Sequence, residues 1–197
     1  MTIALALVAA YVVGSIDFAL IIARLHGVDI TKVGSGNPGA SNVLRTLGKG
    51  PAAAVMVGDA LKGVIAAAMG MVASGVADPQ VHWAFAAGLA AVIGHCYPVF
   101  HRFKGGRGVA TSLGLLLYTV PVVALIDLAI WLGLVKLTKT ASIGSLVVVL
   151  VTLPLALWRG VTGLALLWLG LTLALVVWRH RANIQRMIQG REQKVPT

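Results

Sequence analysis

Cysteine is nearly absent from this chain, which has a single one, Cys96. A lone thiol excludes an internal disulfide and a cluster of thiolate metal ligands, so we interpret Cys96 as a packing residue. Acidic residues are also scarce, with 6 Asp and Glu against 16 Lys and Arg. The sequence has no H-E-x-x-H or G-x-S-x-G pattern, which argues against a zinc enzyme and a serine hydrolase. We therefore predict no bound metal.

Apolar runs occupy most of the chain, with 58% hydrophobic residues and a mean hydropathy of +0.92. The net charge of +10 lies almost wholly in the gaps between these runs, which favours anionic ligands at a membrane over nucleic acid. The first run has no Lys or Arg before it and exceeds a signal-peptide core, so we interpret it as a transmembrane helix. Five runs approach the roughly 20 residues that cross about 30 Å of hydrocarbon: 3–23, 51–76, 81–100, 141–158 and 161–178.

A sixth apolar stretch, residues 109–135, contains Pro121. Proline cannot donate the helical hydrogen bond, so the stretch is one long tilted helix or two short ones that meet at Pro121. If the stretch forms two helices, nearly all loop cations lie on one side of the membrane and only Arg159 lies on the other, as the positive-inside rule requires. If it forms one helix, the later basic loops move to the other side and the charge bias is reversed.

The two-helix alternative defines the predicted fold. We expect an all-α polytopic membrane protein with seven transmembrane helices, two of them short, the N-terminus outside and the C-terminus inside. The chain shows no linker or long repeat, so residues 1–197 are expected to form a single domain. Residues 184–197 are expected to form a short cytoplasmic helix that frays.

The first inner loop is rich in glycine and precedes a helix that we expect to begin near Ala40. Glycine permits positive φ, successive backbone N–H groups can form an anion nest, and the helix N-terminus adds its dipole. The alternative is an ordinary Gly/Pro/Asn turn. No Gly-Lys-Ser/Thr follows at the spacing of a Walker A loop, so nucleotide hydrolysis is not predicted. The candidate phosphate-binding residues are Gly34, Ser35, Gly36, Asn37, Gly39 and Arg45.

The second inner loop combines cations with three glycines. Lysine offers a mobile point charge and arginine a planar fork, two complementary ways to hold phosphate oxygens. Positive-inside anchoring would explain the cations but not the glycines. His95, just before the loop, is either a base or, as we prefer, a hydrogen-bonded structural residue. The candidate ligands here are Lys104, Gly105, Gly106, Arg107 and Gly108.

Four charged residues lie inside the apolar runs, where such residues face protein or water rather than lipid. Asp59 and Lys62 are three residues apart, so they share a helix face and are expected to neutralise each other in support of the site. Asp17 and Asp127 have no partner that the sequence identifies.

Polar residues also lie at the end of the third inner loop and after the seventh predicted span. Ser142 lies at the start of a span, where capping of the helix and substrate binding are equally good interpretations. His180 and Asn183 are three residues apart, so they share a helix face and can reach one ligand. A basic stop-transfer flank is the alternative, but it requires only Arg179 and Arg181.

This inner surface is rich in hydrogen-bond donors and poor in carboxylates. Such sites orient anionic substrates and stabilise developing negative charge without a covalent intermediate. Acyl transfer from an already activated donor suits these groups. A transporter for phosphorylated solutes is the main rival, but it needs polar access from both faces. A lipid phosphatase would show a base or nucleophile that this sequence lacks.

Four motifs, in this order, resemble the bacterial acyl-phosphate:glycerol-3-phosphate acyltransferase family. They are GSGNPGASNVLR from Gly34, Asp59-x-x-Lys62-Gly63, GHCYPVFHRFKGGRGVAT from Gly94 and HRANIQR from His180. The resemblance implies transfer of an acyl group from acyl phosphate to the 1-hydroxyl of glycerol 3-phosphate, with release of phosphate and lysophosphatidic acid. It also implies no cofactor, a site facing the cytoplasm of the bacterial inner membrane, and a soluble phosphate acyltransferase that supplies the donor.

The resemblance further assigns roles to matching positions. It implies phosphate contacts from Arg45 and Lys104, and glycine N–H groups that cradle a phosphate. Ser35 and Asn37 would orient the substrates, His180 with Asn183 would hold the glycerol phosphate, and Ser142 would bind substrate. The chain departs from the family pattern at three positions, Ser41, Arg107 and Ala182, where Thr, Lys and Glu are usual.

Overall fold

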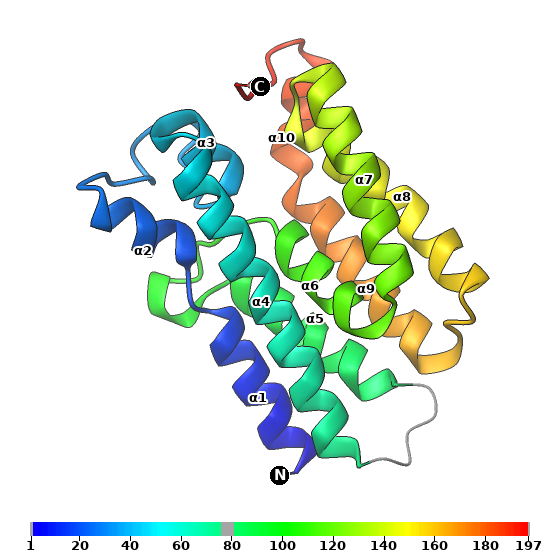
Figure 1. Ribbon diagram of the computed structural model, residues 1–197. Coiled ribbons are helices and arrows are strands. Elements are labelled where there is room, and N and C mark those ends of the chain that lie inside the picture. Colours follow the sequence, from blue (N-terminus) through cyan, green and yellow to red (C-terminus); the bar gives the residue numbers. More distant parts are fainter. Residues whose placement is uncertain (1, 76–80, 197) are drawn as a thin grey trace.

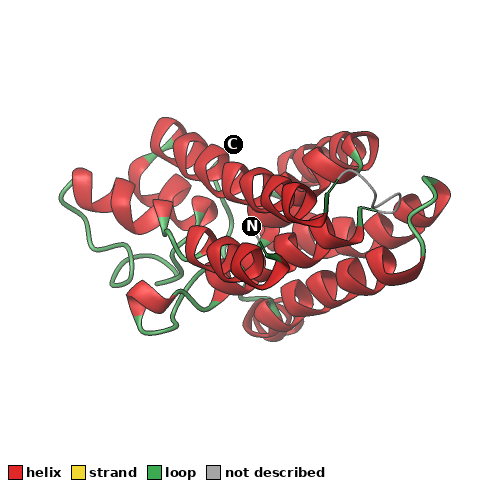
Figure 2. Ribbon diagram, turned by 90° about the horizontal axis from the view of Figure 1, so that it is seen from below, coloured by secondary structure: helices red, strands yellow, loops and turns green. Residues whose placement is uncertain are grey.

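The computed structural model describes residues 2–75 and 81–196, and within these ranges the chain is helical and has no β-strand (Figures 1 and 2). The all-α prediction is confirmed. The predicted outer loop at 77–80 and the end of the second apolar run at 76 lie outside the described residues. The helices are α1 (Ile3–Gly14), α2 (Phe18–Leu25), α3 (Ala40–Leu47), α4 (Lys49–Ser74), α5 (His82–Cys96), η1 (Val99–His101), α6 (Val109–Thr119), α7 (Pro121–Thr138), α8 (Ala141–Trp158), α9 (Gly163–Arg179) and α10 (Arg181–Ile188).

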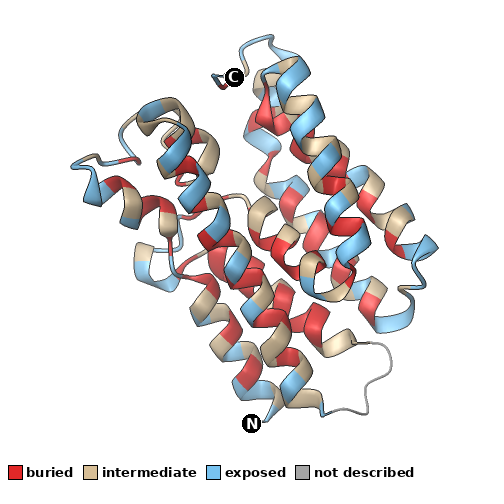
Figure 3. Cartoon of the chain, in the orientation of Figure 1, coloured by how far each residue is buried: buried red, intermediate tan, exposed pale blue. Residues whose placement is uncertain are grey.

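Five helical segments are long and apolar enough to cross a membrane, and one of them, Ile3–Leu25, is made of α1 and α2 together. A sixth is obtained when α9 and α10, which bend by 50° at their junction, are taken as one span. Helix α6 is apolar but shorter. Exposed positions lie along several helices (Figure 3). They include large apolar residues, as lipid requires, and Val72 and Leu150 are 75% and 73% exposed.

The first apolar run is not one continuous helix, in contrast to our expectation. Helix α1 ends at Gly14, and Asp17 caps α2 by accepting a hydrogen bond from the Leu20 N–H at 2.9 Å. The break frees backbone carbonyls inside the molecule, where an unpaired polar group is costly. Lys62 Nζ donates to the carbonyls of Gly14 and Ile16, at 3.1 and 2.7 Å. A buried lysine therefore stabilises the interruption.

Pro121 divides the ambiguous stretch, as predicted. Helix α6 ends at Thr119, and Pro121 occupies the first turn of α7, where its missing N–H costs nothing. The two helices have 11 and 18 residues, so α6 is short as expected, but α7 is long enough to span and the prediction that both are short is wrong. The single long helix is thereby excluded.

Close backbone approach joins α4 to α6. A Cβ atom at Gly114 would lie 1.8 Å from the carbonyl oxygen of Ala60, and one at Gly63 would lie 2.0 Å from that of Thr111. Small residues permit this contact between membrane helices, where packing rather than the hydrophobic effect drives association. The pairing holds the loops at the ends of α4 and α6 in fixed relative positions.

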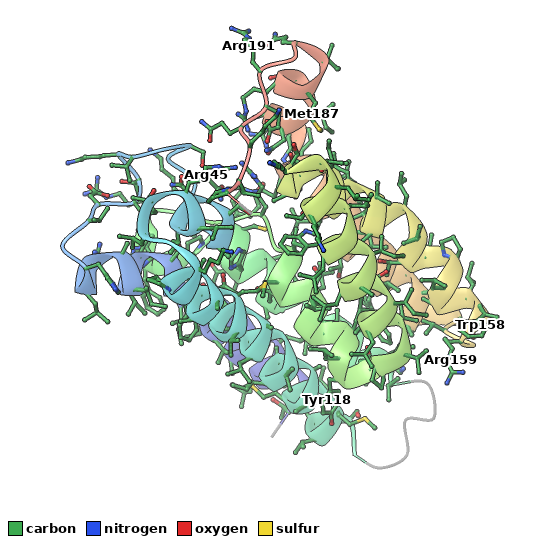
Figure 4. All side chains as sticks on the ribbon, turned by 45° about the horizontal axis from the view of Figure 1, so that its top comes forward. Arg45, Tyr118, Trp158, Arg159, Met187 and Arg191 are labelled. Atoms are coloured by element: carbon green, nitrogen blue, oxygen red, sulfur yellow. The ribbon has the colours of Figure 1, made fainter. Side chains whose placement is uncertain are left out.

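The N- and C-termini lie at opposite ends of the molecule (Figure 1). Arg45 and Arg191 lie at one end, whereas Tyr118, Trp158 and Arg159 lie at the other (Figure 4). The glycine-rich loops are at the end that carries Arg45. Helix α10 begins at Arg181, earlier than expected, and residues 191–196 are not helical. The expected fraying is wrong in one respect, because Val195 is only 3% exposed and its N–H donates to the Lys139 carbonyl at 2.7 Å.

Candidate active site

Asn42 shapes the first glycine-rich loop. Its Oδ1 accepts from the Ser35 N–H at 2.9 Å, and its Nδ2 donates to the carbonyls of Ile30 and Val33. Gly34 has φ of +58°, and a Cβ atom there would lie 2.2 Å from Asn42 Oδ1. Glycine is thus required for both conformation and space. Helix α3 begins at Ala40, as predicted, with Gly39 as its N-cap.

The glycines of the second loop pack against the end of α5. Cβ atoms at Gly105 and Gly106 would lie 2.1 Å from the His95 carbonyl oxygen and the His95 Nε2. The Gly106 N–H donates to that carbonyl, so it is not free to cradle a phosphate in this conformation. The carbonyls of both glycines accept from Arg179, at 2.7 and 3.0 Å. Close packing therefore explains these two glycines.

Asp59 and Lys62 form the predicted ion pair, with Lys62 Nζ 2.8 Å from Asp59 Oδ1. His95 joins them, since its Nδ1 lies 3.1 Å from Lys62 Nζ. All three side chains are buried. The cluster links α4, α5 and the end of α1, which fits the supporting role expected for these residues.

Ser142, Asn183 and Arg186 converge on one carboxylate, that of Glu192 in the C-terminal tail. Ser142 Oγ donates to Glu192 Oε1 at 2.9 Å, and Asn183 Nδ2 donates to the same oxygen at 2.5 Å. Arg186 Nε contacts Oε2 at 2.8 Å. The N-cap of α8 is Thr140, so the capping interpretation of Ser142 is wrong. Ser142 and Asn183, which were predicted to bind substrate, thus hold a carboxylate together with Arg186, which was not predicted.

Arg45 holds the same tail from the other side. Its Nε donates to the Lys194 carbonyl at 2.9 Å, and its Nη2 donates to the Gln193 carbonyl at 3.2 Å (Figure 4). Burial lowers the pKa of Arg45, and the nearby Glu192 carboxylate partly offsets this effect. The tail therefore lies across the predicted phosphate ligands.

His180 lies at the bend between α9 and α10 and is 1% exposed. Its Nδ1 donates to the Val176 carbonyl at 2.7 Å, which leaves Nε2 as the acceptor of a neutral ring. Asn183 is equally buried, and its Oδ1 has no hydrogen-bond partner among the described residues. Both side chains thus have one polar atom available to a ligand.

Two neighbouring pockets bring most of the predicted residues together, but Gly34, Lys62 and Gly106 line neither of them. The inner pocket, of about 140 Å³, enters the helical bundle, and the outer one, of about 1140 Å³, is open. Both are lined by Ser35, Asn37 and Arg107. The inner pocket is also lined by Gly39, Arg45, Asp59, His95, Gly108, Ser142 and His180. The outer pocket is also lined by Gly36, Lys104, Gly105, Asn183 and Arg186.

Arg107 stands between the two pockets. Burial and the nearby positive charge of Arg186 lower the pKa of its guanidinium to about 10, so it stays protonated at neutral pH. Glu192 opposes this shift. A permanent cation at the junction favours an anion that bridges the two pockets.

The sequence alone did not reveal three contributors to the site: Asn42, Arg186 and Glu192. Asn42 was part of a recognised motif, but its two-sided hydrogen bonding depends on the folded loop. Arg186 and Glu192 lie in a segment that looked like a fraying tail. Among residues 2–75 and 81–196, no group of three or more His, Cys, Asp or Glu side chains is placed to hold a metal.

The arrangement of loops and helices is shared with known proteins. A family model described as "Glycerol-3-phosphate acyltransferase" matches residues 4–190. The chain belongs to the glycerol-3-phosphate acyltransferase family. Proteins of that name from Sinorhizobium medicae and Halalkalibacterium halodurans are 45% and 42% identical to it, over 96% and 97% of this chain and 90% and 94% of theirs. One from Pseudomonas paraeruginosa is 43% identical over 93% of this chain and 95% of its own.

Solved structures of a family member show the same fold. The integral membrane glycerol 3-phosphate acyltransferase PlsY (YgiH) is 40% identical, and its glycerol 3-phosphate form superposes with a TM-score of 0.91 over 99% of this chain and 96% of that one. A form of PlsY with lysophosphatidic acid gives 0.89 over the same shares. This glycerol-3-phosphate acyltransferase is therefore a multi-pass membrane enzyme of phospholipid synthesis.

Proposed function

We propose that this acyltransferase moves a fatty acyl group from acyl phosphate to the 1-hydroxyl of sn-glycerol 3-phosphate. The products are lysophosphatidic acid and inorganic phosphate. The family assignment covers acyl transfer to glycerol 3-phosphate. The use of acyl phosphate as donor and of the 1-hydroxyl as acceptor are the parts that we propose. PlsY in its glycerol 3-phosphate and lysophosphatidic acid forms supports the acceptor and the product.

The observation that carries the donor assignment is the shape and lining of the inner pocket. Its outer end has Arg45, Arg107 and Ser142, whereas its inner part runs between membrane helices and is lined by Leu113 and Leu128. An acyl phosphate has the same two parts, a charged head and an apolar chain. The outer pocket has the cations and space for a second phosphate-bearing substrate, with Lys104 and Arg186 among its lining residues.

The proposed step is direct. The 1-hydroxyl oxygen of glycerol 3-phosphate bonds to the acyl carbon, and the bond from that carbon to the phosphate oxygen breaks. The phosphate leaves with the electron pair and takes the hydroxyl proton, so no protein base is required. Arg45, Lys104 and Arg107 would neutralise the phosphates, and donors aimed at developing charge lower the barrier.

The remaining residues would position the substrates. Ser35 and Asn37, which line both pockets, would orient the reacting groups, while His180 and Asn183 would hold the glycerol phosphate. Glycine N–H groups other than that of Gly106 remain candidates for the phosphate cradle. Asp59, Lys62 and His95 would fix the loops.

We further propose that seven helices cross the bacterial inner membrane, with the N-terminus outside and the site facing the cytoplasm. Helices α1, α4, α5, α6, α7, α8 and α9 would be the spans, all within one domain over residues 1–197. The opposite positions of the termini and the segregation of loop cations from Arg159 support this topology (Figures 1 and 4). A soluble phosphate acyltransferase would supply the donor.

The geometry gives no support to the transporter alternative. A pocket at the far end is lined by Phe85, Thr119, Pro121, Arg159 and Thr162, among others. It shares no lining residue with the inner or outer pocket.

The decisive test supplies purified protein with labelled glycerol 3-phosphate and either palmitoyl phosphate or palmitoyl-CoA. We expect lysophosphatidate and free phosphate with palmitoyl phosphate alone. Product from palmitoyl-CoA alone would overturn the donor assignment. Absence of product from both donors would overturn the enzymatic proposal.

A further inference from the structure

The inner pocket has a definite floor. Helices α8 and α6 run away from the loop end, and helices α7 and α9 run toward it (Figure 1). The deepest lining residue is therefore the one with the highest number on α6 and α8, and the one with the lowest number on α7 and α9. These residues are Leu116 on α6, Asp127 on α7, Thr152 on α8 and Leu173 on α9. From Ser142 to Thr152 the rise of an α-helix gives a depth of roughly 15 Å.

The floor is polar although the walls above it are largely apolar. Asp127 and Thr152 are 5% and 2% exposed, and the single hydroxyl hydrogen of Thr152 is shared between Asp127 Oδ2, at 2.7 Å, and the Val148 carbonyl, at 2.6 Å. Leu113, Leu128 and Val149 line the walls. The other carboxyl oxygen, Asp127 Oδ1, is buried and has no hydrogen-bond partner among the described residues. A buried polar atom of this kind needs water or a ligand group to satisfy it.

We propose that the Asp127–Thr152 pair limits the length of the acyl chain that the pocket accepts. This inference rests on the proposed function, since it takes the inner pocket as the acyl site. A chain that ends above the floor leaves space for water on Asp127 Oδ1. A longer chain presses its methyl end onto the carboxyl group and displaces that water without replacing its hydrogen bond.

The competing explanation is that the pair only joins α7 to α8. Interhelical hydrogen bonds of this type stabilise membrane bundles. A purely structural pair would affect all substrates equally, whereas a floor changes the ratio between long and short chains. That ratio is independent of how much protein is folded.

The test measures kcat/KM for lauroyl, myristoyl, palmitoyl and stearoyl phosphate at saturating glycerol 3-phosphate. Asp127→Ala deepens the floor and makes it apolar, and Thr152→Val removes the hydroxyl at almost constant volume. For Asp127→Ala we expect the ratio of stearoyl to lauroyl rates to rise about tenfold, the usual effect of a methylene in an apolar pocket. Thr152→Val should raise it less, and it keeps the test valid where Asp127→Ala does not fold.

Two variants are matched controls. Asp127→Asn keeps size and polarity, and Ser145→Ala removes a hydroxyl that lies above the floor on α8 and accepts from Trp131 Nε1. Both should retain the wild-type ratio. Equal losses for all chain lengths in Asp127→Ala and Thr152→Val would overturn the floor and leave the structural explanation.

Failure of the proposed function gives a different result. A wild-type protein that turns over none of these donors refutes the donor assignment, not the floor. The floor is then tested by the thermal shift that lauroyl to stearoyl lysophosphatidates produce in wild type and Asp127→Ala. If Asp127→Ala shows the same chain-length preference as wild type in these thermal shifts, the proposed role of the floor is overturned.

Discussion

At the scale of single residues, the two predicted phosphate cations have unlike surroundings. Arg45 is held by tail carbonyls in the inner pocket, whereas Lys104 is exposed on the outer one. Arg45→Ala and Lys104→Ala should each lower kcat/KM by about a hundredfold or more, because each removes a charge that balances developing phosphate charge. Steady-state kinetics check this. Lys136→Ala, an exposed cation outside both pockets, should keep full activity, and an equal loss there would point to a general surface effect.

Lys62 makes several buried contacts at once, so its loss should lower the free energy of unfolding by more than the loss of one hydrogen bond would. Lys62→Met leaves Asp59 charged and buried without its partner, which costs about 3–5 kcal/mol. The double variant Asp59→Leu with Lys62→Met should not restore stability, because the carbonyls of Gly14 and Ile16 remain unpaired. Thermal denaturation in detergent measures both. Full recovery in the double variant would show that the ion pair alone matters.

Gly106 tests whether close packing explains the second loop. Gly106→Ala places a Cβ atom 2.1 Å from His95 Nε2, so the loop must shift and activity should fall at least tenfold. Gly133→Ala on α7 is a matched control, because a Cβ atom there meets nothing within 4 Å. It should leave kinetics unchanged. Equal activity of the two variants would mean that the loop tolerates displacement.

At the scale of elements, the C-terminal tail contacts residues of the candidate site. Glu192 occupies donors on Ser142 and Asn183 that a phosphate is expected to use. Glu192→Ala should therefore lower the KM for glycerol 3-phosphate about tenfold, since one charge-assisted competitor is removed. Lys194→Ala is the control, because the tail uses only its backbone carbonyl. A fall in kcat without a lower KM would instead identify Glu192 as a catalytic group.

The same contact has a defined pH dependence. Burial raises the pKa of Glu192, but hydrogen bonds from Asn183, Ser142 and Arg186 outweigh it, so the pKa lies below its usual range. Ionised Glu192 therefore stabilises the docked tail at any pH above the ordinary pKa of a glutamate. This stabilisation is lost only as the pH falls through the lowered pKa of the docked state. The KM effect of Glu192→Ala should thus be the same at about pH 6 and about pH 8. A tail that releases between these values would contradict this.

The sequence predicted the ends of helices correctly where a residue at the boundary itself causes the helix to end or begin. Pro121 ends α6 and begins α7 because proline lacks an N–H, and Gly39 precedes α3. The break after Gly14 was missed because Ser15, Ile16 and Asp17 look like part of an apolar run. It persists only because Lys62, 46 residues beyond Ile16, satisfies the freed carbonyls.

At the scale of the whole molecule, topology is the remaining prediction. Single cysteines at Lys49 and Arg159, both exposed, should react with a membrane-impermeant maleimide from opposite sides of intact cells. Arg159→Cys should label from outside and Lys49→Cys only after permeabilisation. Native Cys96 is buried and gives little background. Labelling of both from the same side would exclude the seven-span arrangement.

The sequence by itself determined that the chain lies in a membrane, that it is helical and which family it resembles. Apolar runs of membrane length leave no other fold class, and four ordered motifs identify related proteins. It also predicted residues that the fold brings together, since Ser35, Arg45, Arg107, Ser142 and His180 were chosen by residue type and all line the inner pocket.

Only the tertiary structure decided which groups those residues contact. It showed that Gly105 and Gly106 serve packing against His95, that a tail carboxylate lies on the anion ligands, and that Asp127 has Thr152 as its partner. These contacts join segments far apart in the chain. Local pattern encodes helix formation and solvent preference, whereas distances between helices depend on packing that no single segment specifies.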